Sequence, residues 1–178
     1  MITKMKPVKL THAFAYGAFN PGISQAWIKK IIKENFDTGN KRDSLQDCPV
    51  LSALSPSALG PPFDRLEVFL NTKGYTFRKS LNYYASCSLI YVSGCIEWHD
   101  DPGYGVCASV LLYQNKRKGY DNFCQLLTRH GGLSLRIGDV FVFDANKGHA
   151  WLGNVDCLLA MMTTKKVRGK KLATDSII

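Results

Sequence analysis

Two stretches in the first half of the chain carry apolar residues at helical spacing. Residues 24–36 place them on one stripe with lysines outside it, which predicts an amphipathic helix packed on a sheet rather than on a membrane surface. The stripe consists of Trp27, Ile28, Ile31, Ile32 and Phe36. A second helix is predicted over residues 62–74, because this stretch begins with proline and ends at glycine. The first twenty residues and residues 37–62 are rich in turn residues, and we expect irregular structure there.

From residue 83 onward the pattern changes to short apolar runs that are typical of strands. The expected strands cover residues 88–98, 106–113, 123–127, 133–137, 140–143, 149–152 and 157–164, and a brief strand over residues 75–79 makes about eight. Gly131 and Gly132 are expected to form a turn. Short, evenly spaced strands predict a sandwich or a barrel-like roll. The expected fold class is therefore α+β and mainly β.

Length and composition favour one domain over residues 1–178, since 178 residues that are 46% hydrophobic can bury a full core. We expect helical support and loops over residues 1–80, the β-core over 81–167 and a basic tail over 168–178. No apolar run is long enough for a membrane span or a signal peptide, so a cytoplasmic, intracellular protein without a membrane partner is expected. The six cysteines show no C-x-x-C pair and are expected to be reduced core thiols.

The chain has a formal net charge of +9, and its basic residues cluster over residues 29–30, 116–118 and 165–171. A basic surface attracts phosphate backbones, so nucleic acid or another acidic polymer is a candidate partner. The alternative is that these side chains form only a solvated face.

Candidate metal chemistry centres on His99, Asp101 and His149. In an extended strand His99 and Asp101 share a face, and a strand folded back beside the first would add His149. Two histidines and one carboxylate leave three coordination positions open, as in non-haem Fe(II) oxygenases. The strand period favours Asp101 over Asp100, although a local bulge would exchange them, and aspartates before Pro-Gly are also ordinary turn residues.

Three other residues have weaker claims on this site. Glu97 shares the predicted face with His99 and is expected to support a hydrogen-bond network. His12 and His130 are expected to be surface histidines rather than ligands, because the first lies in the irregular start and the second in a turn.

The ordered set of His99-x-Asp101, the strand over residues 106–113, the Gly131-Gly132 turn, the Gly-Asp strand from Gly138 and finally His149 resembles the core of Fe(II)/2-oxoglutarate dioxygenases. The resemblance covers about residues 88–166. It implies a double-stranded β-helix, of jelly-roll or cupin-like form, with about eight strands braced by two N-terminal helices. It also implies Fe(II) on His99, Asp101 and His149, with 2-oxoglutarate and O2 as cosubstrates.

The resemblance further implies a basic side chain about ten residues beyond the distal histidine, which grips the remote carboxylate of 2-oxoglutarate. Leu159 stands at that place. The candidates that would substitute for it, and hydroxyl donors that would assist them, are Lys165, Lys166, Arg168, Lys116, Tyr84, Tyr91 and Tyr104. The alternative for each lysine is that it faces solvent.

Three functions stay open on the sequence alone. The first is hydroxylation of a C–H bond in a macromolecule, with nucleic acid as one candidate. The second is prolyl-type hydroxylation of a peptide or protein side chain. The third is a cupin-like metal-binding barrel without 2-oxoglutarate turnover, or a basic nucleic-acid-binding module; the spacing of Gly138 and His149 also occurs in cupin barrels, but no H-x-H lies upstream.

Overall fold

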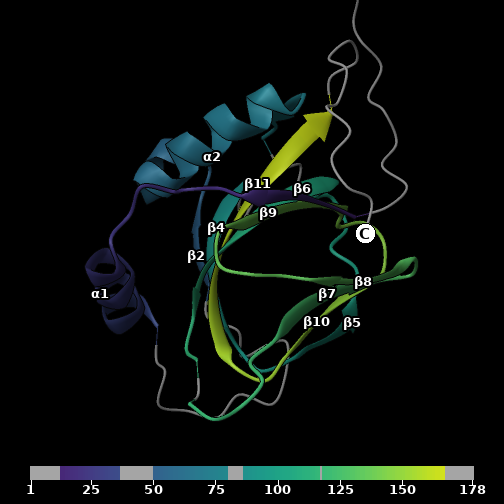
Figure 1. Cartoon of the computed structure of the whole chain (residues 1–178). Helices are drawn as coiled ribbons and strands as arrows, with labels where there is room; N and C mark the ends of the chain where they lie inside the picture. Colours follow the sequence, from purple (N-terminus) through teal and green to yellow (C-terminus); the bar gives the residue numbers. More distant parts are fainter. Residues whose placement is uncertain (1–12, 37–49, 80–85, 117, 167–178) are drawn as a thin grey trace, which may run out of the picture.

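The computed structural model describes residues 13–36, 50–79, 86–116 and 118–166. Two antiparallel sheets lie face to face, and two helices cover the outer face of the larger one (Figure 1). The protein is mainly β with a jelly-roll core, as the sequence predicts.

The larger sheet has the order β1-β9-β6-β11-β4-β2, with β3 paired to the end of β11. Its strands are β1 (Phe14–Ala18), β2 (Val50–Ala53), β3 (Tyr75–Phe77), β4 (Cys87–Ser93), β6 (Val106–Gln114), β9 (Asp139–Asp144) and β11 (Asp156–Lys166). The smaller sheet has the order β5-β10-β7-β8 and consists of β5 (Ile96–His99), β7 (Cys124–Thr128), β8 (Gly131–Ser134) and β10 (His149–Gly153). The eight strands from β4 to β11 form the double-stranded β-helix.

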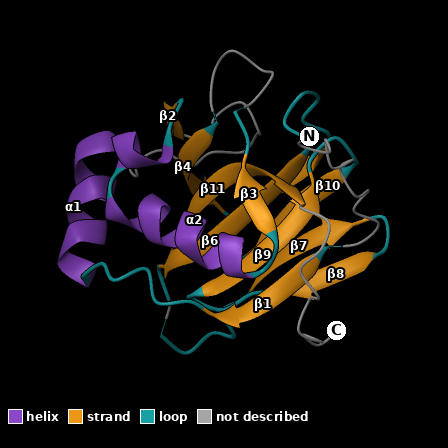
Figure 2. Cartoon of the chain, turned by 90° about the horizontal axis from the view of Figure 1, so that it is seen from above, coloured by secondary structure: helices purple, strands orange, loops and turns teal. Residues whose placement is uncertain are grey.

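The two helices, α1 (Gln25–Asn35) and α2 (Pro61–Thr72), form where the sequence predicts them. The Ser24 hydroxyl caps α1 by accepting a hydrogen bond from the Trp27 N–H, and α2 follows the 3₁₀ turn η2 (Pro56–Leu59). Both helices lie on the same side of the larger sheet (Figure 2). Phe63 and Leu66 of α2 are fully buried there, so α2 is held mainly by apolar packing.

A second apolar cluster fills the space between the sheets. Alternation along β11 separates the two cores: Leu158, Ala160 and Met162 face the helices, whereas Cys157 and Leu159 face the smaller sheet. The metal-ligand candidates lie at the edge of this second cluster.

The stretch expected as one strand over residues 88–98 is two strands in different sheets. Gly94 has φ of 84° and breaks it, so β4 pairs within the larger sheet while β5 pairs with β10 in the smaller one. The expected Gly131-Gly132 turn is also wrong, because both residues belong to β8 and the turn lies just before them.

Two strands occupy segments that were expected to be irregular. β1 pairs with β9, and β2 pairs with β4, so each adds an outer strand to the larger sheet. Residues 37–49 of the expected loop lie outside the described part of the chain.

Five cysteines fall within the described residues, and all five are free thiols. Cys87, Cys107, Cys124 and Cys157 are buried, as expected of core thiols, whereas Cys95 is exposed and is not a core residue. Among the described helices, none has the length and apolar character needed to cross a membrane.

Candidate metal centre

Strand pairing brings the two candidate histidines side by side. β5 ends at His99, β10 begins at His149, and these two residues are partners in the antiparallel register. Asp101 lies two residues beyond the end of β5, in a turn, where its N–H donates to the Ala145 carbonyl oxygen at 2.7 Å. The backbone therefore holds all three candidates at one end of the barrel.

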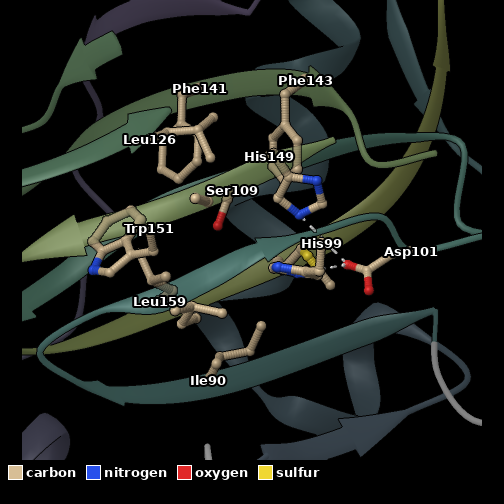
Figure 3. Close-up of a pocket in the computed structure, with 13 residues that line it drawn as sticks. Ile90, His99, Asp101, Ser109, Leu126, Phe141, Phe143, His149, Trp151 and Leu159 are labelled. Carbon is tan, nitrogen blue, oxygen red and sulfur yellow. Dashed lines mark ion pairs between the residues drawn. The ribbon is translucent and has the colours of Figure 1, made fainter. Parts of the chain in front are cut away.

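The three side chains converge on one another (Figure 3). The His99 and His149 Nε2 atoms lie 3.8 Å and 3.6 Å from the same Asp101 Oδ2. All three possible ligand atoms lie within 4.8 Å of one another. These spacings allow one ion to contact all three residues.

Both imidazoles are oriented by a carbonyl oxygen two residues earlier in the chain. His99 Nδ1 lies 2.7 Å from the Glu97 oxygen, and His149 Nδ1 lies 2.9 Å from the Lys147 oxygen. A carbonyl only accepts, so each Nδ1 carries a hydrogen, and Nε2 is the ring nitrogen that faces the carboxylate. This is the tautomer in which a histidine binds a metal through Nε2.

His149 is buried, and burial lowers its pKa below the ordinary value because the charged form loses hydration. The nearby His99 acts in the same direction, while the bond to the Lys147 carbonyl opposes the shift. The neutral imidazole, which is the form that binds a metal, is therefore favoured at neutral pH.

A β-bulge in β5 lets both Ile96 and His99 point into the barrel. His99 pairs with His149 and Ile96 pairs with Trp151, so three steps along β5 match two steps along β10. Ile96 and His99 both line the pocket, while Glu97 is exposed and serves His99 only through its backbone carbonyl. The expected role of the Glu97 side chain is therefore not seen. β5 also ends before Asp101, so the turn, not strand alternation, places that carboxylate.

The turn over residues 101–105 is fastened from two sides. Asn146 Oδ1 accepts from the Gly103 and Gly105 N–H groups at 3.0 Å and 3.2 Å. Arg78 Nη2 donates to the Gly103 and Tyr104 carbonyl oxygens, each at 3.2 Å. The sequence analysis missed both residues. Arg78 is far from the candidates in the chain and belongs to no motif. Asn146 lies in the link between β9 and β10, three residues before His149, and its position was a usable signal.

A pocket that is partly open to solvent is lined by the three candidates and extends away from them. Its walls come from both sheets and are almost entirely apolar (Figure 3). The wall residues beyond the candidates are Ile90, Ile96, Ser109, Leu126, Phe141, Phe143, Ala150, Trp151, Leu159 and Met161.

Leu159 lines this pocket, and no lysine or arginine does so among the described residues. Lys165 is exposed near the C-terminal end of β11. Because that end of β11 pairs with the start of β6, Lys165 lies at the same end of the barrel as the candidates, but it does not line the pocket. Lys116 is exposed beyond the other end of β6, where the Asn115 N–H donates to the Asp156 oxygen. The structure therefore does not bring Lys116 to the site.

The remaining candidates lie in other places. Tyr91 is buried in the helix-side core, where it stacks on Phe36 at 5.8 Å between ring centroids, so it does not face the pocket. Tyr104 is half-buried in the turn, and burial raises its pKa, with the Asp101 charge adding to the effect. His130 is exposed between β7 and β8, as expected. Tyr84, Arg168, His12 and the side chain of Lys166 lie outside the described residues.

Comparisons with known proteins show likeness of fold only. No family model and no curated protein matches the chain. A prolyl-4-hydroxylase from Pseudomonas putida matches with a TM-score of 0.53 and 12% identity, covering 89% of this chain and 95% of that one. A 2OG-Fe(II) oxygenase family oxidoreductase from Burkholderia pseudomallei matches with a TM-score of 0.46 and 11% identity, over 92% and 88% of the two chains. A cupin-2 domain protein from Shewanella frigidimarina matches with a TM-score of 0.34 and 15% identity, over 48% and 74%.

Proposed function

We propose that this protein is a mononuclear non-haem Fe(II) oxygenase that hydroxylates a C–H bond with a 2-oxo acid as cosubstrate. The observation that carries the proposal is the convergence of His99, Asp101 and His149, with both Nε2 atoms directed at the same carboxylate oxygen. Two imidazoles and a carboxylate on one side of an ion leave positions open for small ligands, which is the arrangement of this enzyme class. The likeness of fold to the Pseudomonas putida prolyl-4-hydroxylase supports the proposal.

The described residues have separate tasks in this function. His99 and His149 supply neutral nitrogen ligands, and Asp101 supplies the negative charge that favours a divalent cation. The Glu97 and Lys147 carbonyls fix the rings before metal arrives, so little ordering is needed on binding. The apolar wall around Phe143 and Trp151 excludes water from the reacting groups. When bound, iron supplies the redox chemistry with O2 that no side chain can provide.

The residues fit iron better than they fit 2-oxoglutarate. A dicarboxylate held at the metal would carry its second carboxylate into the pocket, where no described lysine or arginine lies to receive it. This observation favours a second candidate function, a cupin-like metal barrel that turns over no oxo acid.

The substrate that is hydroxylated is a separate question. Lys116 and Lys118 lie at the end of the barrel opposite the candidates, so that loop does not steer a polyanion to the metal. We keep a macromolecular substrate, either peptide or nucleic acid, as the proposed class.

Anaerobic titration with Fe(II), or with Mn(II) as a stand-in, tests the metal centre. We expect one ion per chain in the unaltered protein and no stoichiometric binding in His149→Ala. His130→Ala is the matched control, because it removes an exposed histidine from the β7–β8 turn. The assignment is wrong if His149→Ala binds metal like the unaltered protein, or if His130→Ala loses it.

A further inference from the structure

The charge pattern of the pocket beside the proposed metal centre limits the ligands that it can hold. Asp101 is the one carboxylate in its lining, and no described lysine or arginine joins it. Farther from the candidates, the walls close with large apolar side chains from both sheets (Figure 3). The labelled ones are Ile90, Leu126, Phe141, Trp151 and Leu159. A ligand group that enters this space loses its hydration and contacts apolar side chains instead.

The two polar groups in the far wall cannot replace a cation. The Ser109 hydroxyl already donates to the Ala160 carbonyl oxygen at 3.0 Å. The Trp151 indole N–H is buried without a partner among the described residues, and it offers a single neutral donor. One neutral hydrogen bond does not offset the hydration that a full carboxylate loses in an apolar pocket.

None of the described basic residues at this end of the barrel lines the pocket. Arg78 donates from Nη2 to the Gly103 and Tyr104 carbonyl oxygens, and its buried Nε has no partner among the described residues, but the side chain does not line the pocket. Lys147 pairs with Asp144 at 3.3 Å and is also absent from the lining. Lys165 is exposed on β11. The charge balance of the pocket therefore disfavours a ligand that carries a second carboxylate into it.

We propose that the cosubstrate of this site is a 2-oxo monocarboxylic acid with an apolar side chain, such as 4-methyl-2-oxopentanoate or phenylpyruvate, rather than the dicarboxylate 2-oxoglutarate. The proposal rests on the proposed function. The single carboxylate and the keto oxygen of such an acid stay at the metal end, while the side chain meets the wall formed by Leu126, Phe141 and Leu159.

The reaction balances with O2 as the oxidant. The bond between C1 and C2 of the oxo acid breaks and releases CO2, and one oxygen atom of O2 converts the former keto carbon into a carboxylate. The other oxygen atom enters the C–H bond of the substrate, whose hydrogen remains on the new hydroxyl. The oxo acid and the substrate each lose two electrons, and these four electrons reduce O2.

Binding is measured without turnover. The protein is loaded with Fe(II) under anaerobic conditions and titrated with 2-oxoglutarate, 4-methyl-2-oxopentanoate or phenylpyruvate, while the visible charge-transfer band of the chelate is followed. Thermal unfolding of the Mn(II)-loaded protein with each acid gives an independent readout. We expect an apolar acid to bind about tenfold more tightly than 2-oxoglutarate, or better, because only the latter buries an unpaired carboxylate.

Two variants add a positive charge to the wall of the pocket. Met161→Lys adds a cation at a partly buried wall position, and Leu159→Lys adds one at a more buried position. Each is expected to raise affinity for 2-oxoglutarate and lower affinity for 4-methyl-2-oxopentanoate. Leu152→Lys is the control, because Leu152 lies on the neighbouring strand β10 but is 37% exposed and does not line the pocket.

The outcomes separate this inference from the proposed function. Equal or tighter binding of 2-oxoglutarate by the unaltered protein overturns the inference and leaves the oxygenase intact. Metal binding without a chelate band or a thermal shift for any oxo acid overturns both and favours the cupin-like barrel. Because the comparison uses the unaltered protein, it stands even if neither lysine variant folds.

Discussion

Arg78 contacts no metal-ligand candidate directly, yet it fastens the turn that carries Asp101. Its Nη2 donates to two carbonyl oxygens of that turn, and its guanidinium lies against Gly105, whose φ of 70° suits glycine. Asp101 sits two residues before the first of these carbonyls. We predict that Arg78→Met loosens the position of the Asp101 carboxylate.

The size of the effect follows from the bonds lost. Two hydrogen bonds from a charged donor disappear, and water can reach part of the site, so we expect the free energy of unfolding to fall by about 2 kcal/mol. Residues that orient metal ligands typically change metal affinity by about 10- to 100-fold, and we expect a loss in that range. Arg78→Lys should restore part of the affinity, because an ammonium group still donates to a carbonyl.

The assay is anaerobic Fe(II) titration, with urea unfolding of the metal-free protein measured in parallel. Lys79→Met is the matched control, because Lys79 is the exposed neighbour of Arg78. A variant that loses stability but binds Fe(II) with unchanged affinity would show that Arg78 supports only the fold. An unchanged affinity and an unchanged stability would refute the reasoning altogether.

Two further predictions concern the core. Phe63→Ala should lower the free energy of unfolding by about 3–5 kcal/mol, because this fully buried ring packs α2 against the larger sheet. Val68→Ala, on the exposed face of α2, is the control and should change that free energy little; urea unfolding measures both. Burial raises the pKa of the Cys87 thiol to about 12, with the Glu67 charge adding to the effect. The folded protein therefore keeps a proton that the unfolded chain loses above pH 9, so stability should fall between pH 9 and about 12, by at most about 1.4 kcal/mol per pH unit from this group. Cys87→Ala should reduce that slope, and an unchanged slope would contradict the assignment.

Local pattern was enough to predict the helices and most core strands. The stripe containing Ile28 and the Pro-to-Gly limits of α2 are properties of the sequence itself, and they reappear in the fold with small shifts at the ends. β1 and β2 escaped prediction because they are short segments whose hydrogen bonds come from β9 and β4, which are far away in the chain. Their strand character depends on tertiary pairing more than on local periodicity.

The metal-ligand candidates were predictable as residues but not as geometry. His99 and His149 stood out by motif, and the returning strand that pairs them was anticipated. The bulge between Ile96 and His99 was not, because nothing in the local alternation reveals how β5 registers against β10. Arg78 and Asn146 act through backbone atoms of the turn. No residue pattern marks Arg78, and the only sequence signal for Asn146 is its closeness to His149.

The loop after β6 lies at the end of the barrel opposite the metal-ligand candidates, so it can be modified without disturbing them. β6 separates the turn after Asp101 from the loop that carries Lys118 by nine strand residues, or about 30 Å. Lys118 and Tyr120 are exposed in that loop. A fluorophore, an affinity handle or a surface tether placed there would sit too far away to touch the pocket. Protein immobilised in this way would leave the end of the barrel that carries His99, Asp101 and His149 facing the solution, which suits capture of an unknown substrate.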